Sequence, residues 1–291
     1  MTQTAASQTV HVNGVDLAWS ERRSGPQDSP TFLLCHGFTG SSLDFSLQVD
    51  AIASDRRVVT LDQRGHGHST KTGTLEGYGI DQLAADLIAF IEAVGDGPVD
   101  LLGHSMGGRV SLLVVLDRPD LVNSLVLMDT SAWSFMPPDE SVLALVRAWI
   151  EAFDPSKGMP EGGRLGPPGP EDALIEAATQ AEWLAEKDAI FAGMDAYAVK
   201  ALGMALLAEL DGGETSLRPD LPNIVCPTTV IAGEHDHPLV DQAPELAAEV
   251  GDGTLTVIPG AYHSPQLTHP DAWRAAVEDH LTRVDAARQR T

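Results

Sequence analysis

Short apolar runs alternate with longer helical patterns towards both ends of this 291-residue chain, and this alternation constrains the fold more than any other feature. The apolar runs stand at residues 31–35, 57–61, 99–102, 122–128, 228–232 and 254–258. Such runs are typical of strands that are buried on both faces of a sheet. Apolar residues recur at helical spacing within residues 80–94, 105–116, 239–250 and 271–287. This order predicts an α/β fold, with a mostly parallel central sheet and helices on both faces.

The alternation is interrupted between residues 131 and 221. Strand signals vanish there, and helical patterns occupy residues 141–153, 171–191 and 197–210, with a Gly/Pro-rich break at 158–170. A connection between two strands normally runs only a few residues, so this segment is too long to be a simple loop. We therefore predict a core formed by residues 1–130 and 222–291, and an inserted helical cap formed by residues 131–221.

The chain is strongly acidic, with 18 Lys and Arg against 42 Asp and Glu and a formal net charge of -24. Nucleic acid needs a basic surface, so it is excluded as a partner. No apolar run approaches the roughly 18 residues of a membrane span, and the N-terminus lacks the regions of a secretory signal. Cys35 and Cys226 do not form a disulfide framework. We expect a globular, reduced, cytoplasmic protein without a membrane partner, and the oligomeric state stays open, a homodimer included.

A serine stands at the centre of the segment Gly103-His-Ser105-Met-Gly107, which fits the pattern G-x-S-x-G. The segment lies directly between a predicted strand and a predicted helix, which is the setting of a strained turn with an exposed serine hydroxyl. The two glycines let the strand and the helix approach the turn without a Cβ clash. The turn also places the Met106 N–H at a helix N-terminus, where it suits a developing oxyanion. We predict that Ser105 is a nucleophile.

A serine needs a base, and ten histidines are available. His263 follows the predicted strand 254–258, and its loop lies at the sheet edge where sites form in parallel sheets. His66 and His68 lack the continuation of a metallohydrolase motif and are expected to shape a loop. His104 adjoins the nucleophile and points away from it on a sharp turn, while His280 is expected at the surface. We therefore predict that His263 is the base.

The base needs a carboxylate that orients its ring and stabilises the imidazolium. Asp236 follows the strand 228–232, which gives the chain order Ser105, Asp236, His263 expected of this constellation. Glu234 and Asp129 also follow strands and are rivals for the role. His235 and His237 are discounted as a metal site. The sequence thus predicts an Asp236-oriented triad that uses neither a metal nor another cofactor.

At this point the chain resembles the α/β-hydrolase superfamily over nearly its whole length. The resemblance rests on the serine turn and on four further segments in the expected order: His36-Gly-Phe-Thr-Gly-Ser, Asp62-Gln-Arg-Gly-His-Gly-His-Ser69, Gly233-Glu-His-Asp236 and Pro259-Gly-Ala-Tyr-His263. The resemblance implies that Phe38 and Met106 donate the oxyanion-hole N–H groups. It also implies a helical cap over residues 131–221. Haloalkane dehalogenases and epoxide hydrolases are similar too, but they carry Asp where Ser105 stands.

The reaction that this set of residues performs most simply is cleavage of an ester, thioester or lactone through an acyl-enzyme. The expected substrate is a small to medium, largely apolar molecule. Carbon–carbon hydrolases are similar but typically have Asn where His104 stands. A menaquinone-pathway lyase is also similar, but its multi-anionic substrate favours arginines, and residues 131–221 offer Arg147, Arg164 and Arg218 against 16 acidic residues. Enol-lactonase and perhydrolase activities and a ligand-sensing member without turnover complete the alternatives.

Aromatic and sulfur-containing side chains in the predicted cap are candidates for an apolar pocket. The candidates for lining the pocket are His36, Trp133, Phe135, Trp183, Met194 and Tyr197. For any one of the cap side chains, packing of the cap against the core is the better explanation. The identity of the substrate depends on the shape of this pocket and is not encoded in a motif.

Overall fold

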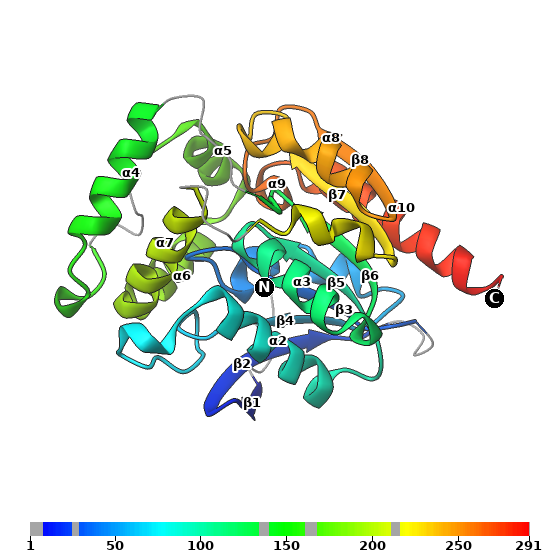
Figure 1. The fold of residues 1–291 in the computed structure, drawn as a ribbon, viewed down its shortest axis with the longest axis horizontal. Coiled ribbons are helices and arrows are strands. Elements are labelled where there is room, and N and C mark those ends of the chain that lie inside the picture. The colour runs from blue at the N-terminus through cyan, green and yellow to red at the C-terminus, as the bar shows by residue number, and fades with distance from the viewer. Residues whose placement is uncertain (1–7, 25–28, 134–139, 161–167, 211–215, 291) are drawn as a thin grey trace.

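A computed structural model describes residues 8–24, 29–133, 140–160, 168–210 and 216–290 of the chain (Figure 1). Its centre is an eight-stranded sheet in the order β1-β2-β4-β3-β5-β6-β7-β8. The strands are β1 (Gln8–Val12), β2 (Val15–Arg22), β3 (Phe32–Cys35), β4 (Val58–Leu61), β5 (Val99–His104), β6 (Val122–Met128), β7 (Pro227–Gly233) and β8 (Asp252–Ile258). All neighbouring pairs from β4 to β8 are parallel, which confirms the predicted fold class.

The first two strands form an antiparallel hairpin that sequence reasoning did not predict. β1 pairs with β2, and β2 pairs with β4, both antiparallel. The turn is Asn13-Gly14, and both residues have positive φ, 47° and 76°. An Asn-Gly turn is a strong local hairpin signal, so this element was readable from the sequence.

Helices cover both faces of the sheet. The core helices are α1 (Val49–Ile52), α2 (Ile80–Val94), α3 (Met106–Asp117), α8 (Leu239–Glu249), α9 (Pro265–Thr268) and α10 (Pro270–Arg288). Short 3-10 helices lie at η1 (Ser42–Phe45), η2 (Leu75–Gly77), η3 (Pro119–Leu121), η4 (Pro155–Lys157) and η5 (Arg218–Asn223). Side chains of α2, α3 and α8 share one buried apolar cluster, and those of α1 and α10 share another on the opposite face. The sheet is therefore enclosed by two separate cores.

His280 of α10 lies in the second core, and the expected surface position is wrong. Its side chain is buried, with Nδ1 at 2.8 Å from Thr229 Oγ1 and Nε2 at 3.0 Å from Ser124 Oγ. Burial lowers the pKa of His280 to about 3, so the ring is neutral. Two hydroxyl partners on the underlying strands explain how a polar ring is tolerated there.

The chain between β6 and β7 contains helices and no strand among its described residues. These helices are α4 (Glu140–Ala152), α5 (Pro170–Ala178), α6 (Ala181–Ala192) and α7 (Ala196–Leu210), and we call residues 131–221 the cap segment. Figure 1 shows α4, α6 and α7 together on the side of the molecule away from the end of α10. The expected single helix over 171–191 is broken, because Thr179 and Gln180 adopt extended backbone.

The start of α7 is held on the core by a buried carboxylate. Asp195 accepts hydrogen bonds from the Tyr78 hydroxyl at 2.6 Å and from the Gly73 N–H at 2.8 Å. A second contact zone packs Ile175 of α5 and Trp183 of α6 against Leu43 and Leu267 of the core. The cap segment is thus attached to the core at two separate places.

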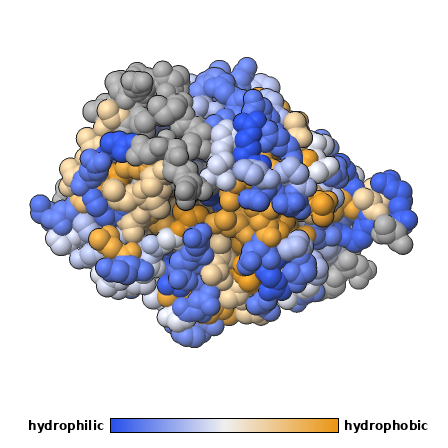
Figure 2. All heavy atoms as spheres, viewed as in Figure 1, coloured by the Kyte–Doolittle hydropathy of each residue, from blue (hydrophilic) through white to orange (hydrophobic). Residues whose placement is uncertain are grey.

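The face of the molecule in Figure 2 is mostly hydrophilic, with an apolar area across its middle. Within the described ranges, no single helix has the length and apolar character that a membrane span requires.

Candidate active site

Ser105 lies on a strained turn between β5 and α3, as the sequence predicts. Its φ is 53° and its ψ is -120°, a conformation that a residue with a side chain rarely adopts. The Ser105 N–H donates to the Met128 carbonyl at 2.9 Å, and the Thr130 hydroxyl donates to the Ser105 carbonyl at 2.7 Å. The backbone is therefore held in the strained state by its neighbour β6, which presents the side chain at the end of the sheet.

The loop after β3 approaches the Ser105 turn closely, and this approach requires a glycine in the loop and another in α3. A Cβ on Gly37, in the loop after β3, would lie 3.0 Å from the Ser105 Cβ. A Cβ on Gly107, in the first turn of α3, would overlap the His36 carbonyl oxygen. The loop after β3 can therefore lie directly beside the serine only because these two positions lack side chains.

His263 and Asp236 form the hydrogen-bonded pair that the sequence predicts. His263 Nδ1 lies 2.8 Å from Asp236 Oδ2, and the loops after β7 and β8 bring the two together. Burial alone would lower the pKa of His263, but the neighbouring carboxylates, Asp236 first, raise it above its usual 6.5. With Nδ1–H donated to Asp236, Nε2 is the ring atom left to take a proton.

A hydrogen bond joins Asp236 to His263. Among the described residues, no hydrogen bond joins the Ser105 hydroxyl to the His263 ring. Catalytic hydrogen bonds are often long before a substrate binds. His104, the residue before Ser105, instead contacts His263. Its Nε2–H donates to the His263 carbonyl at 2.8 Å, and its ring centroid lies 4.8 Å from that of His263. Burial lowers the pKa of His104 to about 3, so a neutral ring supports the His263 backbone.

Asp129, one rival for the acid, lies behind Asp236. It follows β6 with φ of 46°, is 1% exposed, and its Oδ1 accepts the Gly233 N–H at 2.8 Å. Burial and the nearby charge of Asp236 raise the pKa of Asp129 well above its usual range. Burial alone would raise the pKa of Asp236, but the charge and hydrogen bond of His263, and then Asp129, hold it below its usual value.

Glu234, the other rival, is turned away from the base. Its Oε2 accepts the Gly260 N–H at 2.8 Å on the molecular surface. The two histidines beside it are also engaged elsewhere, since His237 Nδ1 lies 2.8 Å from Asp241 and His235 packs on Tyr262. Within the part of the chain that the structure describes, no cluster of three or more His, Cys, Asp or Glu side chains could hold a metal ion.

The segment 62–69 braces the loop that follows β3. Asp62 accepts N–H groups from Ser42 at 2.7 Å and from His68 at 2.8 Å. The Gln63 N–H donates to His36 Nε2 at 3.0 Å, and the Gln63 amide donates to the His36 carbonyl at 2.7 Å. These contacts fix the backbone from which Phe38 projects. His36 is fully buried in them, so its ring shapes this loop.

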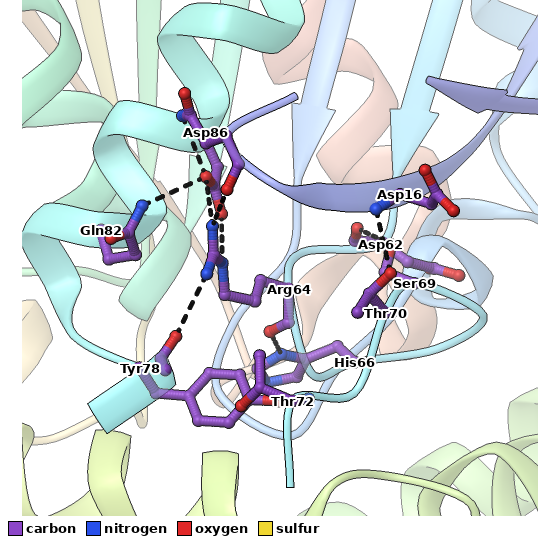
Figure 3. Close-up of polar contacts among 12 residues, drawn as sticks. Asp16, Asp62, Arg64, His66, Ser69, Thr70, Thr72, Tyr78, Gln82 and Asp86 are labelled. Carbon is purple, nitrogen blue, oxygen red and sulfur yellow. Dashed lines mark hydrogen bonds and ion pairs between the residues drawn. The ribbon is translucent and has the colours of Figure 1, made fainter. Parts of the chain in front are cut away.

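A buried ion pair holds the same segment to α2 (Figure 3). Arg64 donates Nε–H to Asp86 at 2.6 Å and Nη2–H to the other oxygen at 2.8 Å. His66 is also buried and donates Nδ1–H to the Arg64 carbonyl at 3.0 Å, with its pKa lowered to about 3 by burial. His66 therefore shapes the loop, as expected from the missing metallohydrolase pattern.

The two residues predicted to donate oxyanion-hole N–H groups flank Ser105. Met106 is the first residue of α3, so its N–H has no acceptor within the helix. Phe38 lies on the braced loop, and its half-buried ring packs against Phe191, Met194 and Val199 of the cap segment. Backbone N–H groups on two rigid elements beside one serine are what stabilisation of an oxyanion requires.

The remaining pocket candidates occupy different surroundings. Met194 is 5% exposed and belongs to the cluster against which Phe38 packs, whereas Trp183 is buried between the rest of the cap segment and the core. Trp133 is half-buried under the Arg218 guanidinium, 4.5 Å from its ring centroid, and Tyr197 is half-buried at the start of α7. Phe135 lies outside the described residues. Met194 thus belongs to a cluster against which Phe38 packs, while Trp133 and Tyr197 pack against the core cluster that contains Met106.

Glu171 is a residue of this region that sequence reasoning did not single out. It lies in the first turn of α5, and its Oε1 accepts the N–H of Ser264, the residue after His263, at 2.5 Å. Burial raises the pKa of Glu171, while the charge of His263 lowers it. An acidic residue in the first turn of a helix is common, so the sequence alone carried no signal of this contact.

A serine on a strained strand–helix turn, with a histidine–carboxylate pair from later strand ends of a mostly parallel sheet, defines the α/β-hydrolase class of proteins. The family model for the alpha/beta hydrolase fold matches residues 30–270, and the chain belongs to this family.

Two relatives and one solved structure are similar to the chain over most of its length. It is 28% identical over 276 residues to a Caulobacter protein named as the carbamate hydrolase RutD, and this match covers 92% of this chain and 97% of the relative. It is 27% identical over 270 residues to 2-(acetamidomethylene)succinate hydrolase of Mesorhizobium japonicum, covering 90% and 92%. A hydrolase structure from Pseudomonas aeruginosa matches with a TM-score of 0.72 and 25% identity, covering 96% of this chain and 99% of that one.

Proposed function

We propose that the chain is a serine hydrolase that cleaves a carboxylic ester, thioester or lactone through an acyl-enzyme. The observation that carries the proposal is the His263–Asp236 pair at 2.8 Å on the same sheet edge as the strained Ser105. A carboxylate-oriented imidazole beside an exposed serine hydroxyl is an arrangement for nucleophilic acyl transfer.

The proposed reaction uses the chain's own groups in two half-reactions. His263 Nε2 takes the proton of Ser105 as its Oγ attacks the acyl carbon, and Asp236 stabilises the imidazolium. The N–H groups of Phe38 and Met106 hold the oxyanion of the tetrahedral intermediate. As the intermediate collapses, His263 gives its proton to the leaving alcohol, and water then releases the acid by the same route.

The proposed substrate is a small to medium, largely apolar ester. Support comes from the apolar cluster of Phe191, Met194 and Val199, which packs on Phe38 beside the nucleophile. Apolar walls with a few convergent polar groups are typical of small-molecule sites. We propose that the cap segment acts as the lid of this pocket.

Carbamate cleavage is the second candidate. The Caulobacter relative that covers nearly the whole chain is named as a carbamate hydrolase. A carbamate has the same acyl carbon as an ester, so the same serine attack and the same oxyanion stabilisation apply to it. The two candidates differ in the atom bonded to the acyl carbon, which is carbon in the ester and nitrogen in the carbamate.

A substrate panel decides between them. Rates are measured for p-nitrophenyl esters of increasing acyl length, a lactone, and a p-nitrophenyl carbamate, each with Ser105→Ala as the blank. The proposal expects fast release of nitrophenolate from a short or medium ester and slower turnover of the carbamate. Faster turnover of the carbamate favours the second candidate, and turnover of neither contradicts both.

A further inference from the structure

Glu171 brings a carboxylate from the cap segment to the catalytic base. Its hydrogen bond to the Ser264 N–H places it next to His263, and α5 is docked there through Ile175 and Leu267. Glu171 raises the pKa of His263, and the charge of His263 lowers the pKa of Glu171. The contact is therefore part of the site and not of the outer surface.

Carboxyl side chains raise the pKa of His263 and so stabilise its imidazolium, Asp236 first, followed by Asp129 and Glu171. Asp236 faces the Nδ1 side of the ring, where its charge is matched by the N–H. The Glu171 carboxylate has a backbone N–H, and not a cation, as its hydrogen-bond partner, so this contact does not neutralise its negative charge.

The described cations of the cap segment are engaged away from this site. Lys200 donates to two carbonyl groups of α4, and Lys187 lies over the Trp183 ring. The other described cations each pair with a carboxylate, as Arg147 with Glu151, Lys157 with Asp154, and Arg218 with Glu245 and Glu249. An anionic substrate group near Glu171 would meet a like charge.

We propose that Glu171 is a specificity-determining residue that selects against acyl groups ending in a negative charge, so that the substrate carries a neutral or cationic acyl group. This proposal rests on the proposed ester hydrolysis. It also separates this chain from its Mesorhizobium relative, whose name specifies a succinate.

The test compares two p-nitrophenyl esters of similar length, the neutral butyrate and the anionic hemisuccinate. The ratio of their kcat/KM values, neutral over anionic, is measured for the wild-type chain, Glu171→Gln and Glu171→Asp. Glu176→Gln is the matched control, because Glu176 is exposed on the same helix. Removing a charge near the site is expected to lower the ratio about 5- to 10-fold in Glu171→Gln, chiefly through KM of the hemisuccinate.

Glu171→Asp and Glu176→Gln are expected to keep the wild-type ratio. Added salt is expected to lower the ratio of the wild type and to leave that of Glu171→Gln unchanged, because screening acts only on a charge that is present. An unchanged ratio in Glu171→Gln overturns the proposal. Equal slowing of both esters also overturns it, since that result assigns Glu171 to docking of the cap segment alone.

Failure of the proposed function is distinguishable from failure of this inference. If wild-type protein hydrolyses neither ester but a neutral p-nitrophenyl phosphonate diester still labels Ser105, ester hydrolysis alone is contradicted. The ratio of neutral over anionic substrate is then measured from labelling rates, with that diester as the neutral compound and its ω-carboxylate analogue as the anionic one. A lower ratio in Glu171→Gln supports charge selection, and an unchanged one rejects it.

Discussion

The strand ends of the core and the cap segment contribute to the site in different ways. In the core, Ser105, Asp236 and His263 follow β5, β7 and β8 and are held by backbone hydrogen bonds and a strained turn. In the cap segment, helices approach the site through side chains, namely Met194 in the cluster against which Phe38 packs and Glu171 on Ser264. The difference teaches that the sheet positions the candidate catalytic residues, and it motivates the proposal that the cap segment selects the substrate.

Conservative replacement of Asp236 and of Asp129 tests the core side of this comparison. Asp236→Asn removes the acceptor of His263 Nδ1–H, and the rate is expected to fall by roughly 10⁴ because the ring adopts the wrong tautomer. Asp129→Asn keeps an acceptor for the Gly233 N–H, so a loss of about 10-fold or less is expected. The kcat of both variants on p-nitrophenyl butyrate is measured. The reverse ranking would assign the acid to Asp129.

Ion pairs provide a stability test of the same contrast. Asp86→Ala leaves Arg64 buried without its carboxylate and is expected to lower the free energy of unfolding by about 3–5 kcal/mol. Glu151→Ala breaks the exposed pair with Arg147 in α4 and is expected to cost less than about 1 kcal/mol. Urea unfolding measures both. Similar losses would contradict the expected difference between the buried pair of the core and the exposed pair of the cap segment.

The pH dependence sharpens the comparison, because carboxylates of both regions act on one ring. A base must be neutral to take a proton, and Asp236 and Glu171 raise the pKa of His263 above 6.5 despite its burial. The midpoint of the acid limb of kcat/KM is therefore expected above pH 6.5, with activity lost below it. In Glu171→Gln the midpoint is expected to move to lower pH. A wild-type midpoint at or below 6.5 contradicts this balance of charges.

The smallest expected effect concerns the shape of the pocket. Met194→Ala removes a side chain of the cluster against which Phe38 packs, and we expect the preferred p-nitrophenyl ester to become longer, with changes of a few-fold. Leu207→Ala, at a buried position of α7 outside this cluster, is the control and should leave the preference unchanged. A neutral phosphonate label reports whether the nucleophile itself is altered. Equal effects of Met194→Ala on labelling and on chain length would show a structural role.

The core was more predictable from the sequence than the cap segment for a physical reason. The bounds of β6 and α2 coincide with their apolar patterns, and the predicted site residues lie at strand ends, which one edge of a parallel sheet brings together. The break at Thr179 was missed because apolar spacing continues across it. The contacts of Glu171 with Ser264, and of Asp129 with Asp236, depend on tertiary placement that no local pattern encodes.

The central claim is that Ser105 carries the acyl group, and mass spectrometry of the rapidly quenched enzyme tests it most directly. After mixing with p-nitrophenyl butyrate, the account predicts a burst of nitrophenolate and one butyryl group on the peptide that contains Ser105. Ser105→Ala, with an unchanged unfolding midpoint, should show neither the adduct nor turnover. Steady turnover without an adduct, an adduct on another residue, or turnover that survives in Ser105→Ala would contradict the account.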